Sequence, residues 1–179
     1  METSAHLILH TLARHLRVEA SVRLFGGPAL ILGYGARRFT EDADFLLDDA
    51  EFQVLVDAGL EQALERTNEE LAPRGLYVSH IFGPEQEILT PAWRERCRKV
   101  PDIGGTLHVE VLGPLDLITS KLGRADAQDL DDIRFLIERE RLLPALVRAA
   151  VAEARVPEGL IEVFAESRLR LERLLASSP

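Results

Sequence analysis

Two aspartates that stand one residue apart, Asp42 and Asp44, are the residues of this sequence best placed to do chemistry. They alternate with Ala43 and Phe45, so on a β-strand both carboxylates would point to one face of a sheet. Two carboxylates on one face repel each other, and a bound divalent cation removes that repulsion. Because Mg²⁺ is commonly held by one or two carboxylates together with substrate phosphates, this pair predicts a metal site that serves a phosphorylated substrate.

A pair of glycines ahead of the aspartates supports the same chemistry. Gly26 and Gly27 follow an apolar stretch expected to be a strand, residues 21–25, and precede a stretch expected to be a short helix, residues 28–35. Backbone N–H groups at such a junction between strand and helix can meet a phosphate. Together the glycines and the aspartates indicate metal-assisted chemistry on a nucleoside triphosphate.

Glu110 is the best candidate for a third metal ligand. Two-metal chemistry on phosphates needs carboxylates that bridge two cations, usually with a further carboxylate from another strand. Glu110 is a lone acidic residue within the otherwise apolar strand expected at residues 106–112. The alternative is an edge strand on which Glu110 faces solvent. Beside Asp42 and Asp44 we favour the metal ligand.

The remaining pattern places these residues on a sheet that is followed by helices. Apolar residues at helical spacing predict helices, and alternating stretches predict strands. Before residue 112 the expected helices span 5–17, 28–35 and 49–68, and the expected strands span 21–25, 42–48, 76–82, 98–100 and 106–112. From residue 114 onward the sequence predicts helices, with breaks near 123–124, 144 and 157–159.

This order of elements favours an α+β fold. We expect a small mixed β-sheet of four or five strands, flanked by helices, in residues 1–113. We expect a C-terminal helical region in residues 114–179 that packs on this sheet core, so that the two form one compact domain.

Composition narrows the classes of function. The chain has 179 residues, of which 46% are apolar and 28% charged, as in a globular protein. Its net charge of −9 does not favour a nucleic-acid-binding surface. No apolar stretch approaches the roughly 20 residues that cross a bilayer, and the N-terminus lacks the pattern of a secretory signal. We therefore expect a cytoplasmic protein without a membrane partner.

The order of these motifs resembles that of the nucleotidyltransferase superfamily. A glycine pair, a helical spacer and two alternating carboxylates, as in residues 26–44, are similar to its signature. The later segment GPLDLITSKLGRADAQDLDDI resembles the helical motif of a minimal bacterial branch, which includes AbiEii-type toxins and relatives of unknown function. The residues that match this motif are Asp116, Leu117, Lys121, Arg124, Asp129 and Asp132.

The resemblance implies a role for each carboxylate and for the glycines. Asp42 and Asp44 would bridge two Mg²⁺ or Mn²⁺ ions, and Glu110 would bind the ion near the attacking hydroxyl. Gly26 and Gly27 would let the backbone approach the triphosphate.

Three further residues are implied as nucleotide ligands. Lys121 would neutralise phosphate charge, although a lysine near an apolar stripe can also be a surface residue whose stem covers that stripe. Arg38 would also neutralise phosphate, or would instead pair with an acid of its own loop and fix that loop. Asp129 would reach the site, or would simply benefit from the macrodipole near the start of its helix.

The function that the resemblance implies is a Mg-dependent nucleotidyltransferase. Such an enzyme transfers a nucleoside monophosphate from an NTP to an acceptor hydroxyl, here on a tRNA, a protein or a small molecule. A toxin of a toxin–antitoxin system, with an antitoxin as its partner, is one setting for this activity. Two alternatives are a catalytically weak nucleotide-binding or protein-interaction module and a metal-dependent phosphoesterase.

Overall fold

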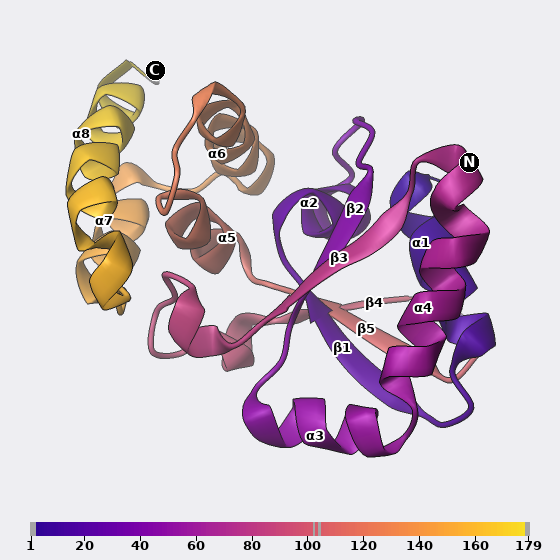
Figure 1. Cartoon of the computed structure of the whole chain (residues 1–179). Helices are drawn as coiled ribbons and strands as arrows, with labels where there is room; N and C mark the ends of the chain where they lie inside the picture. The colour runs from indigo at the N-terminus through magenta and orange to yellow at the C-terminus, as the bar shows by residue number, and fades with distance from the viewer. Residues whose placement is uncertain (1–2, 102, 104, 178–179) are drawn as a thin grey trace. The chain divides into compact units, whose positions relative to one another are not determined.

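The computed structural model describes residues 3–101, 103 and 105–177, and the chain divides into two compact units. The first unit consists of Met1–Gly83 and Cys97–Leu112, and the second of Pro84–Arg96 and Gly113–Pro179. The expected α+β class is confirmed, because the described residues form a five-stranded mixed sheet, eight α-helices and a C-terminal helical region (Figure 1). The packing of residues 1–113 and 114–179 as one domain stays a prediction.

The sheet belongs to the first unit. Its strands, in spatial order, are β3 (Tyr77–Phe82), β2 (Asp42–Leu46), β1 (Ala20–Leu24), β5 (Leu107–Val111) and β4 (Arg98–Val100). β1 is antiparallel to β2 and parallel to β5. β3 is parallel to β2, and β4 is antiparallel to β5. β1 therefore separates the strand of the two aspartates from the strand of Glu110.

Strand register places the candidate acids on one face of this sheet. Arg23 is the register partner of Glu110, and Leu24 is the register partner of Phe45. Register partners share a face, and neighbours along a strand alternate between faces. Leu24 and Phe45 are buried, so Arg23, Glu110 and Asp44 lie on the opposite face, which we call the polar face.

Helices of the first unit pack against the strands. α1 (Ser4–His15) lies beside α4 (Leu60–Leu71), as Figure 1 shows, and contacts α2 (Gly26–Tyr34). α2 in turn packs on β2, β4 and β5. α3 (Asp49–Asp57) begins with a capping box, in which Asp48 and Glu51 each bond the other's backbone N–H.

One expected helix is divided in two. The sequence predicts a single helix over residues 49–68, whereas α3 ends at Asp57 and α4 begins at Leu60. Gly59 between them has a φ of 86°, a left-handed conformation that glycine adopts without steric cost and that breaks the helix. The apolar periodicity runs on across this break, which is why the pattern alone does not reveal it.

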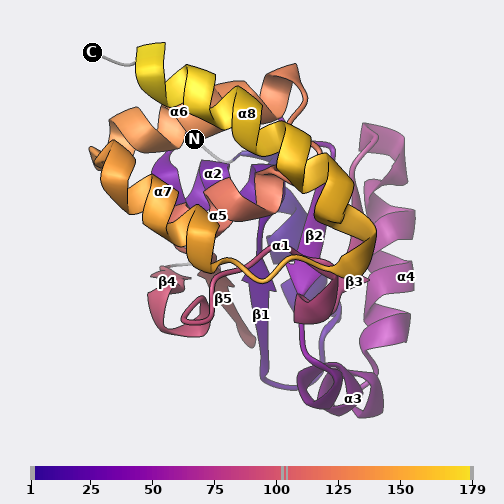
Figure 2. The ribbon, with the colours of Figure 1, turned by 90° about the vertical axis from the view of Figure 1, so that its left-hand side faces the viewer.

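The second unit is helical. It contains α5 (Pro114–Lys121), α6 (Ala127–Glu140), α7 (Pro144–Glu153) and α8 (Ile161–Ser177). The expected breaks near 123–124, 144 and 157–159 lie between these helices. α5 contacts α6 and α7, and Figure 2 shows the long helix α8 beside α6 and α7. Among the described residues, none of the helices has the length and apolar character that crossing a membrane requires.

Candidate active site

The glycine pair forms the first turn of α2. The helix expected to begin at residue 28 begins at Gly26, and Phe25 before it supplies no side-chain cap. Gly26 has a φ of 64°, and no heavy atom lies within 4 Å of the position that a Cβ would occupy there. The first backbone N–H groups of a helix have no intrahelical acceptor. α2 thus presents an uncapped N-terminus of the kind that binds anions.

Arg38 and Thr40 lie against this helix start. A Cβ on Gly27 would stand 2.7 Å from Arg38 Nη2 and 3.1 Å from Thr40 Oγ1, so only glycine leaves room for both side chains. Thr40 Oγ1 in turn donates to the backbone oxygen of Asp42 at 3.1 Å and to its Oδ1 at 3.3 Å. The structure therefore brings a cation and the first aspartate to the N-terminus of α2.

One carboxylate oxygen of Asp44 has no hydrogen-bond partner. This oxygen, Oδ1, is buried, and His80 Nδ1 lies 3.9 Å from it. Burial, and next the charge of Asp42, raise the pKa of Asp44 above that of an ordinary aspartate, although hydrogen bonds from the His80 backbone and from Ser79 oppose the rise. A half-buried acid with one unpaired oxygen beside a second acid is a donor set that fits a divalent cation.

Glu110 lies on the same face but in a different environment. Its Oε2 is 3.3 Å from Arg23 Nε, and Arg23 Nη1 also bonds both carboxylate oxygens of Glu51, at 2.6 and 2.7 Å. Within the described part of the chain, no three acids, histidines or cysteines are arranged so as to hold a metal ion. The structure thus groups Asp42 and Asp44 with the helix start and places Glu110 beside Arg23. The role of Glu110 as third ligand stays a prediction.

Arg23 and Glu51 form an ion pair next to Glu110 that the sequence pattern does not predict. Burial opposes ionisation of Glu51, but the Asp48 backbone N–H and the Arg23 guanidinium prevail and lower its pKa. The signal available in the sequence was Arg23 itself, a charged residue between the apolar Val22 and Leu24. Its partner Glu110 could not be named without the register of β1 against β5, nor Glu51 without the position of α3.

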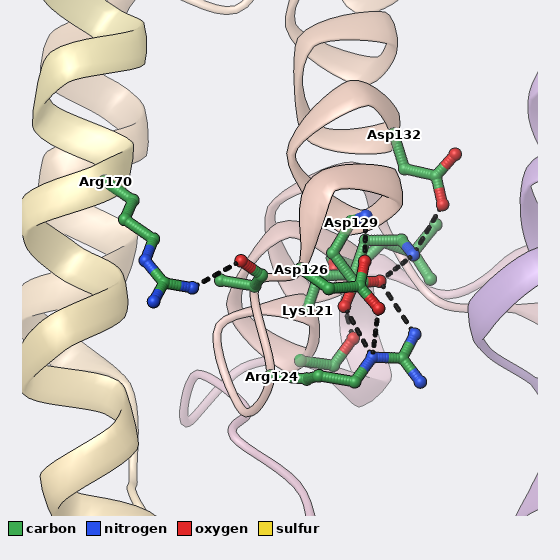
Figure 3. Close-up of polar contacts among 9 residues, drawn as sticks. Lys121, Arg124, Asp126, Asp129, Asp132 and Arg170 are labelled. Atoms are coloured by element: carbon green, nitrogen blue, oxygen red, sulfur yellow. Dashed lines mark hydrogen bonds and ion pairs between the residues drawn. The ribbon is translucent and has the colours of Figure 1, made fainter.

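Lys121 lies in the second unit, where it is buried and paired with two acids. Its Nζ is 2.9 Å from Asp129 Oδ1 and 2.7 Å from Asp132 Oδ2 (Figure 3), and its side chain is only 7% exposed. It is therefore not the surface residue that its position near an apolar stripe allowed. Leu117, Ile118 and Leu122 on the same helical segment are fully buried.

Asp129 joins α5 to α6 through two cations. Arg124 Nε lies 2.9 Å from Asp129 Oδ2, and the backbone N–H of Asp129 donates to Asp126, which caps α6 (Figure 3). Burial would raise the pKa of Asp129, but the hydrogen bond from Arg124 and the charge of Lys121 outweigh it and lower that pKa. Through these contacts the charged residues from Lys121 to Asp132 hold α5 and α6 together. A phosphate-binding role for Lys121 and Asp129 stays a prediction.

Comparison with known proteins agrees with the resemblance found in the sequence. A model of the family described as "Nucleotidyltransferase of unknown function (DUF6036)" matches residues 6–153. This range contains both the glycine and aspartate motifs and the helical motif around Lys121. Neither the curated proteins nor the solved structures include a significant match.

Proposed function

Because the chain belongs to this family of nucleotidyltransferases of unknown function, we propose that it transfers a nucleoside monophosphate from an NTP to an acceptor hydroxyl in a reaction that depends on Mg²⁺ or Mn²⁺. The observation that supports a metal-dependent reaction best is the buried Oδ1 of Asp44, which has no hydrogen-bond partner and stands beside the second acid Asp42. Holding an unpaired carboxylate oxygen in a buried position beside a second carboxylate is unfavourable, and a cation bound with the substrate offsets that cost.

In this proposal the first unit binds the triphosphate. The N–H groups that open α2 and the guanidinium of Arg38 beside Gly27 bind its phosphate oxygens. Asp42 and Asp44 would hold the metal, and Thr40 keeps Asp42 in place by its hydrogen bonds. The bound metal would lower the pKa of the acceptor hydroxyl and neutralise charge on the phosphates. The acceptor oxygen then bonds to the α-phosphorus as pyrophosphate leaves, and the hydroxyl proton passes to water.

The remaining candidate residues enter the proposal with narrower roles. Glu110 would complete the metal site after its carboxylate moves away from Arg23. Lys121 and Asp129 would contact the nucleotide only after the ion pairs that they form with each other and with neighbouring charges break. A role as a toxin that is inhibited by an antitoxin is a further proposal. A small regulator gene adjacent to the gene of this protein would support it.

Thermal unfolding in the presence of Mg²⁺ and a non-hydrolysable NTP tests the metal and nucleotide site. Ligand linkage predicts a stabilisation of about 2.7 kcal/mol at a hundredfold excess over the dissociation constant. Asp44→Asn should abolish the Mg²⁺-dependent part, whereas Asp49→Asn, which changes an exposed acid at the start of α3, should preserve it. An unchanged midpoint for the wild type would refute the proposal.

A nucleotide-binding module without turnover is the second candidate. The pairing of Glu110 with Arg23, away from Asp42 and Asp44, favours it, because the third carboxylate is then not at the metal. Pyrophosphate release separates the candidates. The enzyme releases pyrophosphate once an acceptor is supplied, whereas a binding module is stabilised by NTP and releases none. A phosphoesterase, in which the same acids activate water, would instead release phosphate from the substrate.

A further inference from the structure

A cavity of about 540 Å³ lies on the polar face of the first unit, away from the N-terminus of α2. Its polar lining comes from β1, β4 and β5 and consists of Ser21, Arg23, Lys99, His108 and Glu110. Small-molecule sites typically occupy about 300–1,000 Å³, so the cavity has the size of a site for a metabolite and not for a folded chain. Glu110 borders this cavity. The proposed reaction also needs a binding site for the acceptor.

Among the described residues that line the cavity, Lys99 is a cation whose side chain has no described partner. Arg23 is committed to Glu51 and Glu110 by the contacts described above. Lys99 is the register partner of Glu110 across β4 and β5, yet its side chain makes no hydrogen bond or ion pair with any residue that the structure describes. Glu110, the acid opposite Lys99, is paired with Arg23 instead. Lys99 is exposed and lines the cavity, so its ammonium is available to an anion.

We propose that this cavity is the acceptor site and that it takes a small molecule carrying a phosphate or carboxylate, which Lys99 binds. The proposal rests on the proposed nucleotidyl transfer. The anionic group lies at Lys99 on β4, and the acceptor hydroxyl lies toward Glu110 on β5, one strand nearer to the two aspartates. A nucleic-acid acceptor is disfavoured by the net charge of −9, since polyanions need extended positive surfaces.

The amino-acid usage of the chain makes Lys99 a selective probe. Only two of the 21 basic residues are lysines, and the other one, Lys121, is buried between two acids. Reductive methylation with ¹³C-formaldehyde should therefore label Lys99 and the terminal amine, whose resonances differ in their titration with pH. The terminal amine then serves as an internal reference in the same sample.

The experiment titrates the labelled protein with inorganic phosphate, and separately with acetate, at constant ionic strength. We expect the Lys99 resonance to shift in a saturable way with at least one of the two anions, which also identifies whether phosphate or carboxylate is recognised. Ser21→Phe, which places an aromatic ring in the cavity and retains Lys99, should weaken the saturable shift. A shift of Lys99 that stays linear and follows the terminal amine with both anions would overturn the proposal.

Variants separate this site from the nucleotide site. Lys99→Gln should remove anion binding at the cavity and retain the stabilisation by Mg²⁺ and NTP, while Arg74→Gln, which removes another exposed cation of the first unit, should change neither. Equal loss of anion and NTP binding in Lys99→Gln would assign Lys99 to the nucleotide and refute the acceptor site. Stronger binding of single-stranded RNA than of phosphate, lost in Lys99→Gln, would likewise refute a small acceptor. If the wild type binds phosphate at Lys99 but no NTP, the proposed function fails and the anion site stands.

Discussion

Gly27 and Arg38 form the contact on which the proposed triphosphate site depends. Gly27→Ala would place a methyl group 2.7 Å from Arg38 Nη2, which must move because the backbone of α2 is fixed. The displaced atom is the end of a flexible side chain, so the free energy of unfolding should change by less than about 1 kcal/mol. Loss of one hydrogen bond to a charged phosphate, about 1.5–3 kcal/mol, should weaken NTP binding at least tenfold in a titration.

Gly33→Ala is the matched control for that prediction. A Cβ on Gly33 would lie 2.5 Å from Val111 Cγ2, which is buried in the core. Overpacking of this kind typically costs about 1–3 kcal/mol, so this variant should lose stability but keep its affinity for NTP. The opposite pattern in the two variants, a stable Gly33→Ala and an unstable Gly27→Ala, would contradict the contact between Gly27 and Arg38.

At the residue scale, the sequence predicted what is local and missed what depends on register. The spacing of Asp42 and Asp44 determines their common face wherever a strand forms, and the neighbouring glycines place a helix start nearby. The partner of Glu110 could not be predicted, because Arg23 lies 87 positions earlier and meets it only through the pairing of β1 with β5. The assignments of Glu110 and Lys121 assumed an available side chain, whereas both are already paired in the structure.

The connection between α5 and α6 is an element-scale feature with a pH dependence. The folded-state pKa of Asp129 is lowered, so its ionised form stabilises the protein at any pH above the unfolded-state value, about 3.9. That contribution disappears as the pH falls through the lowered folded-state value. Asp129→Asn should cost about 1.5–3 kcal/mol at pH 7, as expected for hydrogen bonds to a charged group. The difference from wild type should shrink below about pH 4 in urea unfolding curves. A difference that persists unchanged to pH 2 would show that the charge of Asp129 is not its cause.

Element types were easier to predict than element ends. Alternating and helical apolar spacing identified each strand of the sheet and the helical character of residues beyond 114. The observed helix ends differ from the predicted ones where a glycine adopts a special backbone conformation. Gly59 separates α3 from α4, and Gly26 starts α2 two residues earlier than predicted. Both glycines have positive φ values, which apolar periodicity does not report.

At the scale of the whole molecule, the chain leaves the first unit after Gly83 and returns to it at Cys97. The intervening segment, Pro84–Arg96, belongs to the second unit, although it lies between β3 and β4 in sequence. The sequence pattern indicates a division near residue 113 alone. It does not predict that Pro84–Arg96 belongs to the second unit, because a short irregular segment carries no periodicity that would indicate which helices it contacts.

Asp116 holds the segment Pro84–Arg96 against α5. It is fully buried in the first turn of α5, where its Oδ1 accepts hydrogen bonds from the Thr90 backbone N–H at 3.0 Å and from Thr90 Oγ1 at 2.7 Å. Its Oδ2 accepts a bond from Arg96 Nε at 2.9 Å. Gly113 permits this arrangement, since a Cβ there would lie 2.9 Å from the backbone oxygen of Arg96. One carboxylate thus holds both the middle and the end of the segment against α5.

Asp116→Ala should therefore release residues 84–96 while the sheet of the first unit retains its protection. Removing the acceptor leaves the Thr90 N–H and the Arg96 guanidinium without their charged partner, at a cost of about 1.5–3 kcal/mol for each hydrogen bond to a charged group. In native-state hydrogen exchange, a loss of 1.4 kcal/mol is a tenfold faster rate, so the Thr90 amide should exchange at least tenfold faster. Asp131→Ala, which removes only an exposed pair with Arg134, should leave that rate unchanged. If the Thr90 amide keeps its wild-type rate in Asp116→Ala, the segment is held by its apolar contacts, and Asp116 is not its anchor.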